Sequence, residues 1–339
     1  MAGASAAEQG LLGSVWGQAA LSGLLAGLAA TAVTVLIERC GGLIGGVIGT
    51  TPSTILPAAV GIAAAAASQA DLTIAMFTVP MAMACDVLLL ASWRVLPSRL
   101  PQAWPAGTTA AALAALSLAV WALPAASVWA LTSLVLTTAE AVTVAGALTT
   151  AATAAAGVAA TWQMPPTPPG RNAVPCRVLA VRGMGAGVSI FAAVLVSRTS
   201  PALGGLVSAF PAIFLTTMVS VYLAQGADTT VGAVGPMVLG STSVSLFACC
   251  FAAIQPAAGT WPALGAAYCI AIALASVPAT LWLQWRRRAS AAGEAASDQA
   301  ILAAPAPEAD SGVLTVPGLE CDQPSPLQSE TAGGTAVLP

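Results

Sequence analysis

Two acidic residues, Asp86 and Glu140, fall inside long apolar stretches of the sequence. A carboxyl group is costly in lipid and usually faces a cavity, a proton path or a polar partner. Asp86 lies well inside its stretch, so it could titrate during coupled movement of a proton or cation, or form an ordinary interhelical hydrogen bond. Glu140 has the same two interpretations, and a third in which its helix starts just after it and leaves the carboxylate at the membrane surface.

A Gly- and Pro-rich apolar segment occurs twice, at residues 38–58 and 197–217. Each copy has an Arg at the end of one apolar stretch, then a pair of glycines, then a Pro near the middle of the next stretch. One offset of 159 (198 − 39) aligns these positions without a gap. The aligned pairs are Arg39 with Arg198, Gly45 with Gly204, Gly46 with Gly205 and Pro52 with Pro211. The sequence therefore predicts an internal duplication.

The Pro in the first copy predicts a helix that breaks inside the membrane. Thr51-Pro52-Ser53 has the pattern of an N-cap residue followed by Pro at the first helical position. A half-helix starting there would turn its unpaired amide groups and the positive end of its dipole toward whatever lies opposite. Glycines at four-residue spacing, such as Gly45 and Gly49, also permit close helix packing without any binding function. The sequence leaves both interpretations open.

The matched arginines, Arg39 and Arg198, would lie at opposite faces of the membrane if the two copies are inverted. They could then mark equivalent gates of a transport path. In the alternative interpretation, each long side chain merely reaches the nearest lipid–water interface.

The elements that carry these residues must be membrane helices. Hydrophobic residues make up 58% of the chain, charged residues 7%, and the mean hydropathy is +0.87, whereas soluble domains carry roughly a quarter charged residues. Such a chain cannot cover a water-facing surface. We therefore predict an all-α fold, a bundle of helices that span the lipid bilayer.

Few residues suit other kinds of chemistry. The sequence has no His, all ten basic residues are Arg, and the seven Cys residues form no CxxC pair. Cysteines in apolar stretches usually act as small buried hydrophobes, and no basic, aromatic-rich surface for nucleic acid is present. We expect no enzyme activity, no metal site, no cofactor and no nucleic-acid partner.

The apolar stretches and the polar residues between them predict five regions. They are a short tail at 1–10, a first membrane repeat at 11–124, a linking span with a Pro- and Arg-rich cytosolic loop at 125–182, a second membrane repeat at 183–288, and a disordered acidic tail at 289–339. Trp121 and Pro124 are expected to close the fourth span, because Trp is enriched at membrane interfaces. The counterpart of Asp86 would lie near Thr242, in a run of hydroxyl residues.

The distribution of Arg indicates how often residues 125–161 cross the membrane. A single crossing gives about nine spans and puts nine of the ten Arg residues on one side, with Arg198 as the exception and Arg182 in a loop. The N-terminus would then be outside and the C-terminus cytosolic. Four spans per repeat and one joining span would turn the second repeat upside down.

Inverted repeats with broken helices are the architecture of many secondary transporters. We therefore predict a multi-pass membrane protein that transports a small solute or ion, with the broken helices forming the site and Asp86 as the coupling acid. A homo-oligomer is compatible with the sequence. The alternative is a non-transporting scaffold or accessory protein, in which the glycines only pack helices.

The second copy resembles the signature of GlpM-like proteins, which are small bacterial inner-membrane proteins of a few spans. The resemblance covers one repeat and rests on the segment GGLVSAFPAIF. Its residues are Gly204, Gly205, Phe210, Pro211, Ala212, Ile213 and Phe214. The first copy departs from this signature, with Thr51-Pro52-Ser53-Thr54 in place of Phe-Pro-Ala-Ile. The resemblance implies that a four-span unit can stand alone and that this chain joins two of them, and it implies no catalytic residue.

Overall fold

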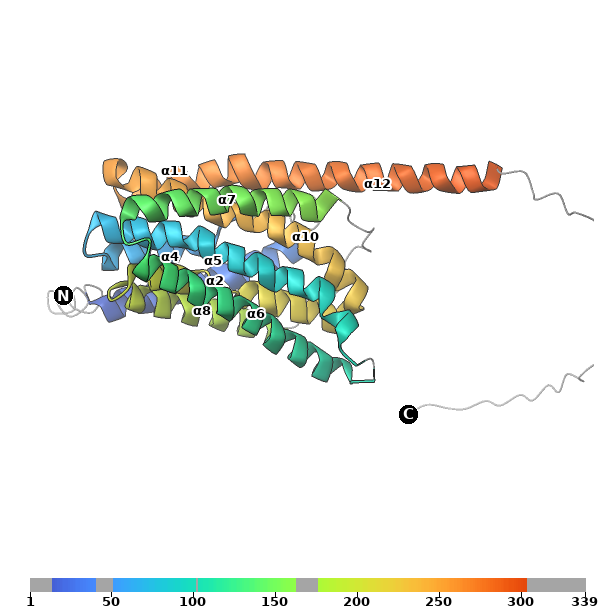
Figure 1. The fold of residues 1–339 in the computed structure, drawn as a ribbon, viewed down its shortest axis with the longest axis horizontal. Helices are drawn as coiled ribbons and strands as arrows, with labels where there is room; N and C mark the ends of the chain where they lie inside the picture. Colours follow the sequence, from blue (N-terminus) through green and yellow to red (C-terminus); the bar gives the residue numbers. More distant parts are fainter. Residues whose placement is uncertain (1–13, 41–50, 102, 163–175, 304–339) are drawn as a thin grey trace, which may run out of the picture. The chain divides into compact units, whose positions relative to one another are not determined.

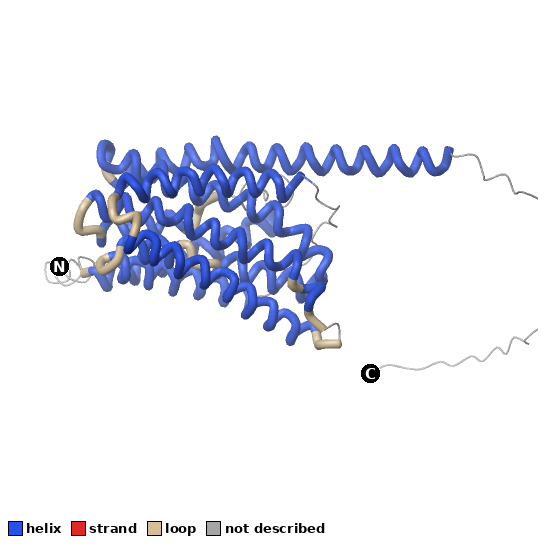
Figure 2. Tube along the Cα trace, in the orientation of Figure 1, coloured by secondary structure: helices blue, strands red, loops and turns tan. Residues whose placement is uncertain are grey.

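The computed structural model describes residues 14–40, 51–101, 103–162 and 176–303, except for the side chains of residues 37–40 and 294–303. The regular elements in these ranges are helices, and none of the described residues forms a strand (Figure 2). Residues 1–294 form one compact unit, to which the contacts below belong, and residues 295–339 form a second. The all-α prediction is confirmed for the described residues.

Seven helical stretches within the described residues are long and apolar enough to cross a membrane, which confirms the features of a multi-pass membrane protein. A 3₁₀ turn, η1 (Pro97–Arg99), follows α5, and a π-helical turn, η2 (Ile272–Ser276), joins α11 to α12. The α-helices in chain order are α2 (Val15–Cys40), α4 (Ile55–Ala65), α5 (Gln69–Val95), α6 (Ala106–Leu134), α7 (Ala139–Trp162), α8 (Cys176–Ser197), α9 (Pro201–Ser208), α10 (Ala212–Ala258), α11 (Thr260–Ala271) and α12 (Val277–Ala303).

Helices α2 and α8 pack side by side in opposite directions (Figure 1). Gly23 contacts Gly187, and Gly27, one turn later, contacts Gly183, one turn earlier. A Cβ atom at Gly23 would lie 2.6 Å from the carbonyl oxygen of Gly187, so these glycines let the two backbones approach closely. The two helices, which occupy matching positions in the predicted duplication, therefore run antiparallel.

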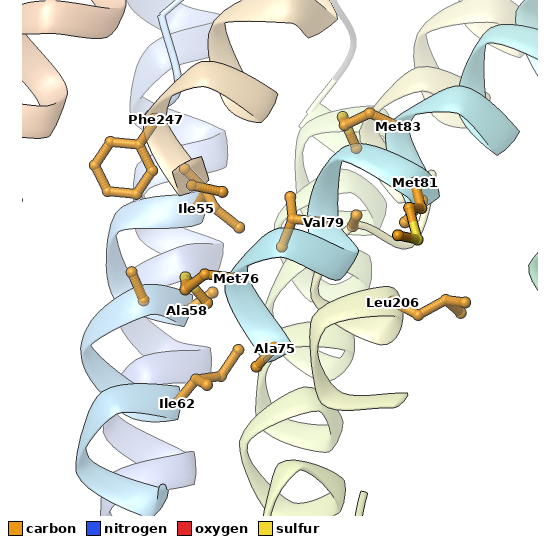
Figure 3. Close-up of a cluster of buried hydrophobic side chains, with 14 of the residues drawn as sticks. Ile55, Ala58, Ile62, Ala75, Met76, Val79, Met81, Met83, Leu206 and Phe247 are labelled. Atoms are coloured by element: carbon orange, nitrogen blue, oxygen red, sulfur yellow. The ribbon is translucent and has the colours of Figure 1, made fainter. Parts of the chain in front are cut away.

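Helix α5 forms much of the buried core. It packs against α6, α7, α9 and α10, and Figure 3 shows its Met76 and Val79 in a cluster with Ile55 of α4. Gly205 of α9 lies directly against the carbonyl oxygen of Ala75. The core is therefore built around the helix that carries Asp86.

Helix α7 lies against both α5 and α10. A Cβ atom at Gly146, near the start of α7, would meet the backbone of Phe77 in α5. A Cβ atom at Gly157, near the end of α7, would meet the backbone of Leu239 in α10. Helix α7, which lies between the two predicted copies in the chain, thus contacts α5 in one part of its length and α10 in another.

Two arginines stabilise the C-terminal end of α7. Arg94 Nη2 donates to the carbonyl oxygen of Ala160 at 2.8 Å. Arg286 donates to the carbonyl oxygen of Trp162 and lies over its ring. Cations suit a helix C-terminus because the helix dipole is negative there. The C-terminal ends of α5 and α7 therefore lie near the Arg-rich part of α12.

Three helix boundaries differ from those predicted. Helix α6 runs through Pro124 to Leu134, because in lipid a chain that left the helix would lose its backbone hydrogen bonds. Helix α8 begins at Cys176, so Arg182 lies in a helix and not in a loop. Residues 289–303 continue α12 as an Ala-rich stretch with high helix propensity, so the predicted disorder does not apply to them. Residues 304–339 lie outside the described part of the chain.

Helix α10 consists of two helices that meet at Gly226, which has φ +84° and ψ −176°, a conformation that is essentially restricted to glycine. A straight helix would separate Pro211 from Gly240 by about 43 Å. Both residues line one cavity, so the chain reverses its direction at Gly226. The two halves, residues 212–225 and 227–258, are called α10a and α10b below.

Candidate functional site

Two helix starts, one from each copy of the duplicated segment, meet at one cavity of about 490 Å³. The lining includes Ser53 and Thr54 before α4, and Phe210 and Pro211 before α10a. Neither N-cap residue, Thr54 of α4 or Pro211 of α10a, makes a side-chain capping bond. The Ala212 N–H donates to the Phe210 carbonyl oxygen at 2.8 Å, and Pro57 has no N–H. The first-turn amides left for other partners are therefore those of Ile55 and Leu56 in α4 and of Ile213 and Phe214 in α10a.

The break in the first copy lies three residues beyond the predicted position. The sequence predicts Thr51 as the N-cap and Pro52 as the first helical residue, whereas α4 begins at Ile55 with Thr54 as its N-cap. A tight turn, in which the Ser53 N–H donates to the Thr51 carbonyl oxygen at 2.9 Å, precedes the helix. In the second copy, α10a begins directly after Pro211.

Asp86 lines this cavity from α5, and its side chain is fully buried. Neither carboxyl oxygen has a hydrogen-bond partner among the described residues. The indole of Trp121 lies close enough to interact with the carboxyl group, although the two groups do not reach hydrogen-bonding geometry and the indole N–H is itself unpaired. Asp86 is therefore a buried polar group whose hydrogen-bonding capacity is unused by the described protein atoms.

Trp121 connects Asp86 to the break in the second copy. Its ring meets that of Phe210 edge-on, with centroids 5.3 Å apart and an interplanar angle of 82°. Phe210 directly precedes Pro211, where α10a begins. The prediction that Trp121 ends a span at the interface is wrong, because Trp121 is buried in the middle of α6.

Helix α10b forms one wall of the cavity, which it lines with Pro236, Gly240 and Ser241. Thr242, the predicted counterpart of Asp86, is outside this lining, and its hydroxyl oxygen is buried without a hydrogen-bond partner. The hydroxyl of Ser241 donates to the carbonyl oxygen of Val238 at 2.7 Å. The first copy thus contributes the carboxyl group of Asp86 to the cavity, and both copies contribute hydroxyl groups.

Arg182 lines the same cavity from α8, and its side chain is buried, with an exposed fraction of 6%. Its guanidinium donates to Thr34 Oγ1 of α2 at 2.8 Å, to Thr217 Oγ1 of α10a at 2.8 Å and to Thr216 Oγ1 at 3.4 Å. Buried charges persist where hydrogen bonds satisfy them. The prediction that Arg182 lies in a loop is therefore wrong. The three hydroxyl groups satisfy its guanidinium and so allow it to lie within a helix.

The other charged candidates lie outside the lining of the cavity. Glu140 is exposed in the first turn of α7, as in the third of its interpretations, and a carboxylate is favourable at a helix N-terminus. Arg198 is exposed in the turn that follows α8. The backbone of Arg39 ends α2, but its side chain is outside the description.

The glycines of the duplicated segment serve close packing where they are described. A Cβ atom at Gly204 would meet Ser197 of α8, and one at Gly205 would meet Ala75 and Thr78 of α5. This agrees with the packing interpretation for the second copy. Gly45 and Gly46 lie outside the described residues.

Three residues of the site were missed by the sequence-based reasoning. Arg182 was assigned to a loop and Trp121 to an interface, and Arg287, which also lines the cavity, was only one of the nine Arg residues placed on one side of the membrane. An Arg inside an apolar stretch has the same significance as Asp86 in α5, but α8 also carries Arg177 near its start, so the pattern alone did not single out Arg182. Nothing comparable distinguishes Arg287 from its two Arg neighbours.

No protein-family model matches the chain, and neither a curated protein nor a solved structure is significantly similar to it. The resemblance to GlpM-like proteins stays a prediction. The function is therefore argued from the geometry of the cavity.

Proposed function

We propose that this protein is a secondary transporter that moves a small solute or ion through the cavity at the two helix breaks. One observation carries the proposal. Broken helices from both copies of the duplication begin at one cavity, together with a fully buried carboxyl group that has no hydrogen-bond partner among the described residues. Transporters of several folds bind their substrates at such helix ends near the middle of the membrane.

In this proposal the chain crosses the membrane about nine times, as two inverted four-span repeats joined by α7. The antiparallel packing of α2 and α8, through Gly23 with Gly187 and Gly27 with Gly183, supports inversion. Repeats of parallel topology would place these matching helices in the same direction. The contacts of α7 with α5 near one end and with α10b near the other also fit a two-fold axis through its middle.

The end of the unit that carries Arg94 and Arg286 is proposed to face the cytosol, because positive residues collect on that side. Both side chains bond the C-terminal end of α7. Arg198 follows α8 at the opposite end, as expected for a repeat partner of Arg39 in an inverted copy. The N-terminus is then outside and the C-terminus cytosolic.

Asp86 is proposed as the coupling acid, because a buried carboxyl group without a fixed partner can take up and release a proton as the cavity opens to either side. Arg182 positions the start of α10a through Thr217 and connects it to α2 through Thr34. The two halves of α10 meet at Gly226, so a movement of α10a is transmitted directly to the cavity wall formed by α10b.

The competing function is a non-transporting scaffold or accessory protein. The close contacts of Gly204 and Gly205 favour it, since glycines that merely pack helices need no substrate. A scaffold predicts that a bulky residue at Gly205 disrupts assembly, whereas Asp86→Asn has no effect on function.

The test uses the full-length protein in lipid vesicles that contain a pH-sensitive dye, exposed in turn to anionic, neutral and cationic solutes. We expect at least one solute to drive proton movement. Asp86→Asn should reduce that rate by roughly a hundredfold, as is typical for the loss of a proton-transferring group. Glu140→Gln is the matched control and should transport normally, because Glu140 is exposed in the first turn of α7.

Size-exclusion chromatography of each variant separates a loss of transport from a loss of folding. Asp86→Glu restores a carboxyl group and should regain part of the activity if Asp86→Asn misfolds. Transport by Asp86→Asn at the wild-type rate, or no movement of any solute by the wild-type protein, would rule out the proposal.

A further inference from the structure

The charged groups that line the cavity are mainly positive. Within the described part of the chain, the lining contains two guanidinium groups, Arg182 and Arg287, and one carboxyl group, Asp86. The N-termini of α4 and α10a also lie at the cavity. A helix N-terminus is equivalent to roughly half a positive charge, so this balance favours an anion over a cation.

Asp86 is an independent indication that the cavity takes a ligand. Its side chain is fully buried, lines the cavity and has no hydrogen-bond partner for either oxygen among the described residues. Buried polar groups in native structures almost always have a partner. A ligand, or a proton that arrives with the ligand, can supply the missing hydrogen-bond partner of Asp86.

The rest of the lining indicates what accompanies the anionic group. Large apolar side chains face the cavity from three helices, namely Met83 of α5, Phe214 of α10a and Met237 of α10b. The volume of about 490 Å³ is within the range of small-molecule sites. An anion with a small apolar body fits both the polar helix starts and these side chains.

On the basis of the proposed transport function, we propose that the substrate is a small monocarboxylate that enters together with one proton. Its carboxylate accepts hydrogen bonds from the first-turn amides of α4 and α10a, and its body packs against the apolar wall. An ionised Asp86 would repel a second negative charge in the same cavity. The monocarboxylate therefore binds when Asp86 is protonated, and the proton travels with it.

Other titratable groups around Asp86 do not replace it in this role. Arg182 and Arg287 line the cavity, and Cys85 is the neighbour of Asp86 in α5. The remaining titratable side chains on helices packed against α5 do not line the cavity. They are Arg99 of η1, Glu140 of α7, and Tyr222, Asp228, Cys249 and Cys250 of α10, and Asp71 and Arg94 of α5 itself also lie outside the lining.

The experiment measures the binding of L-lactate to the purified full-length protein by calorimetry at about pH 6 and about pH 8, where lactate stays ionised. We expect binding to be at least about tenfold tighter at the lower pH. Lactamide, which has the same size without the charge, and choline, which is a cation, should not bind. Asp86→Asn should bind lactate equally well at both pH values.

Arg287→Gln should weaken lactate binding. Arg288→Gln is the matched control and should leave lactate binding unchanged, because Arg288 lies outside the lining. Both side chains are exposed, so both variants are expected to fold. A folded wild-type protein that binds no lactate, or that binds lactamide or choline as tightly, would overturn the inference.

The two proposals fail in different ways. Lactate binding without any proton-coupled flux in vesicles would remove the transport function and leave the anion site in place. Proton-coupled flux of a cation or a neutral solute, without lactate binding, would keep the transporter and remove the monocarboxylate.

Discussion

Asp86 and Pro211 are linked by two aromatic side chains, although the chain separates them by more than a hundred residues. The indole of Trp121 lies beside the carboxyl group, and its ring contacts Phe210, which precedes the start of α10a. Asp86 is thus connected to the start of α10a at Pro211 by a continuous set of side-chain contacts, through Trp121 and Phe210.

Arg182 allows a prediction about stability. Thr217→Val removes an acceptor that lies 2.8 Å from the guanidinium, whereas Thr216→Val removes one at 3.4 Å. Because the shorter bond to a charged group is the stronger, Thr217→Val should lower the free energy of unfolding by about 1–2 kcal/mol. Thr216→Val should lower it by clearly less. Unfolding of the two purified variants in mixed detergent micelles, followed by circular dichroism, measures both.

Valine and threonine have nearly the same shape, so neither substitution leaves a cavity in the packing. Equal destabilisation by the two variants would contradict the assignment of Thr217 as the main acceptor on α10a.

The sequence was sufficient to find Asp86 because an acid in an apolar stretch stands out against its neighbours. It was insufficient for Arg182, because the same rule of membrane electrostatics that places Arg in loops also admits a buried Arg with enough acceptors. Those acceptors, Thr34 and Thr217, come from two other helices. Their approach depends on tertiary packing, which no local pattern records.

At the scale of elements, the duplicated Pro predicts where each copy breaks, but not the residue at which the new helix starts. Pro211 directly precedes α10a, whereas Pro52 is followed by a turn and α4 starts at Ile55. The difference arises from the sequence after the Pro. Ser53-Thr54 can hydrogen-bond locally and so favours a turn, whereas Ala212-Ile213 favours helix directly. The two predicted copies therefore share the break but differ in the residues that follow it.

Gly205 provides a test of helix packing. Gly205→Ala places a methyl group against the carbonyl oxygen of Ala75 and 3.1 Å from Thr78 Cβ. Because the neighbours are a backbone atom and a β-branched side chain, this overpacking should lower the free energy of unfolding by about 1–3 kcal/mol. The measurement is the unfolding temperature of the detergent-solubilised protein.

Gly265→Ala is the matched control, because Gly265 lies in α11 and its added Cβ would have no neighbour within 4 Å. This variant should be as stable as the wild type or more stable by up to about 1 kcal/mol, since Ala favours helix over Gly. A similar loss of stability in both variants would show that backbone freedom, and not packing, is the important property of Gly205.

At the scale of the whole molecule, the all-α membrane fold followed from composition and from the length of the apolar stretches. The span boundaries were predicted less well. Pro124 suggested an end to a helix that continues to Leu134, because lipid penalises an interrupted helix more than water does. The meeting of both helix breaks at one cavity could not be predicted, since it depends on how the two copies fit together.

The proposed topology predicts which residues a membrane-impermeant thiol reagent can label in sealed inside-out vesicles. In a Cys-free background, single cysteines at Ser98 and at the native Cys176 should react, because both would face the cytosol. Single cysteines at Thr138 and Thr199 should react only after the membrane is opened, because both would face outside. All four side chains are exposed, so burial does not protect them.

Labelling of Ser98→Cys and Thr199→Cys from the same side would contradict inversion of the repeats. The open-membrane reaction of every variant is the control for the reactivity of the thiol.

The single-residue junction at Gly226 constrains how the protein is made. With no loop between them, α10a and α10b cannot be threaded through the membrane one after the other as independent spans. We therefore expect the two helices to enter the bilayer together as a hairpin. One wall of the cavity would thus be inserted together with the half-helix that begins at it.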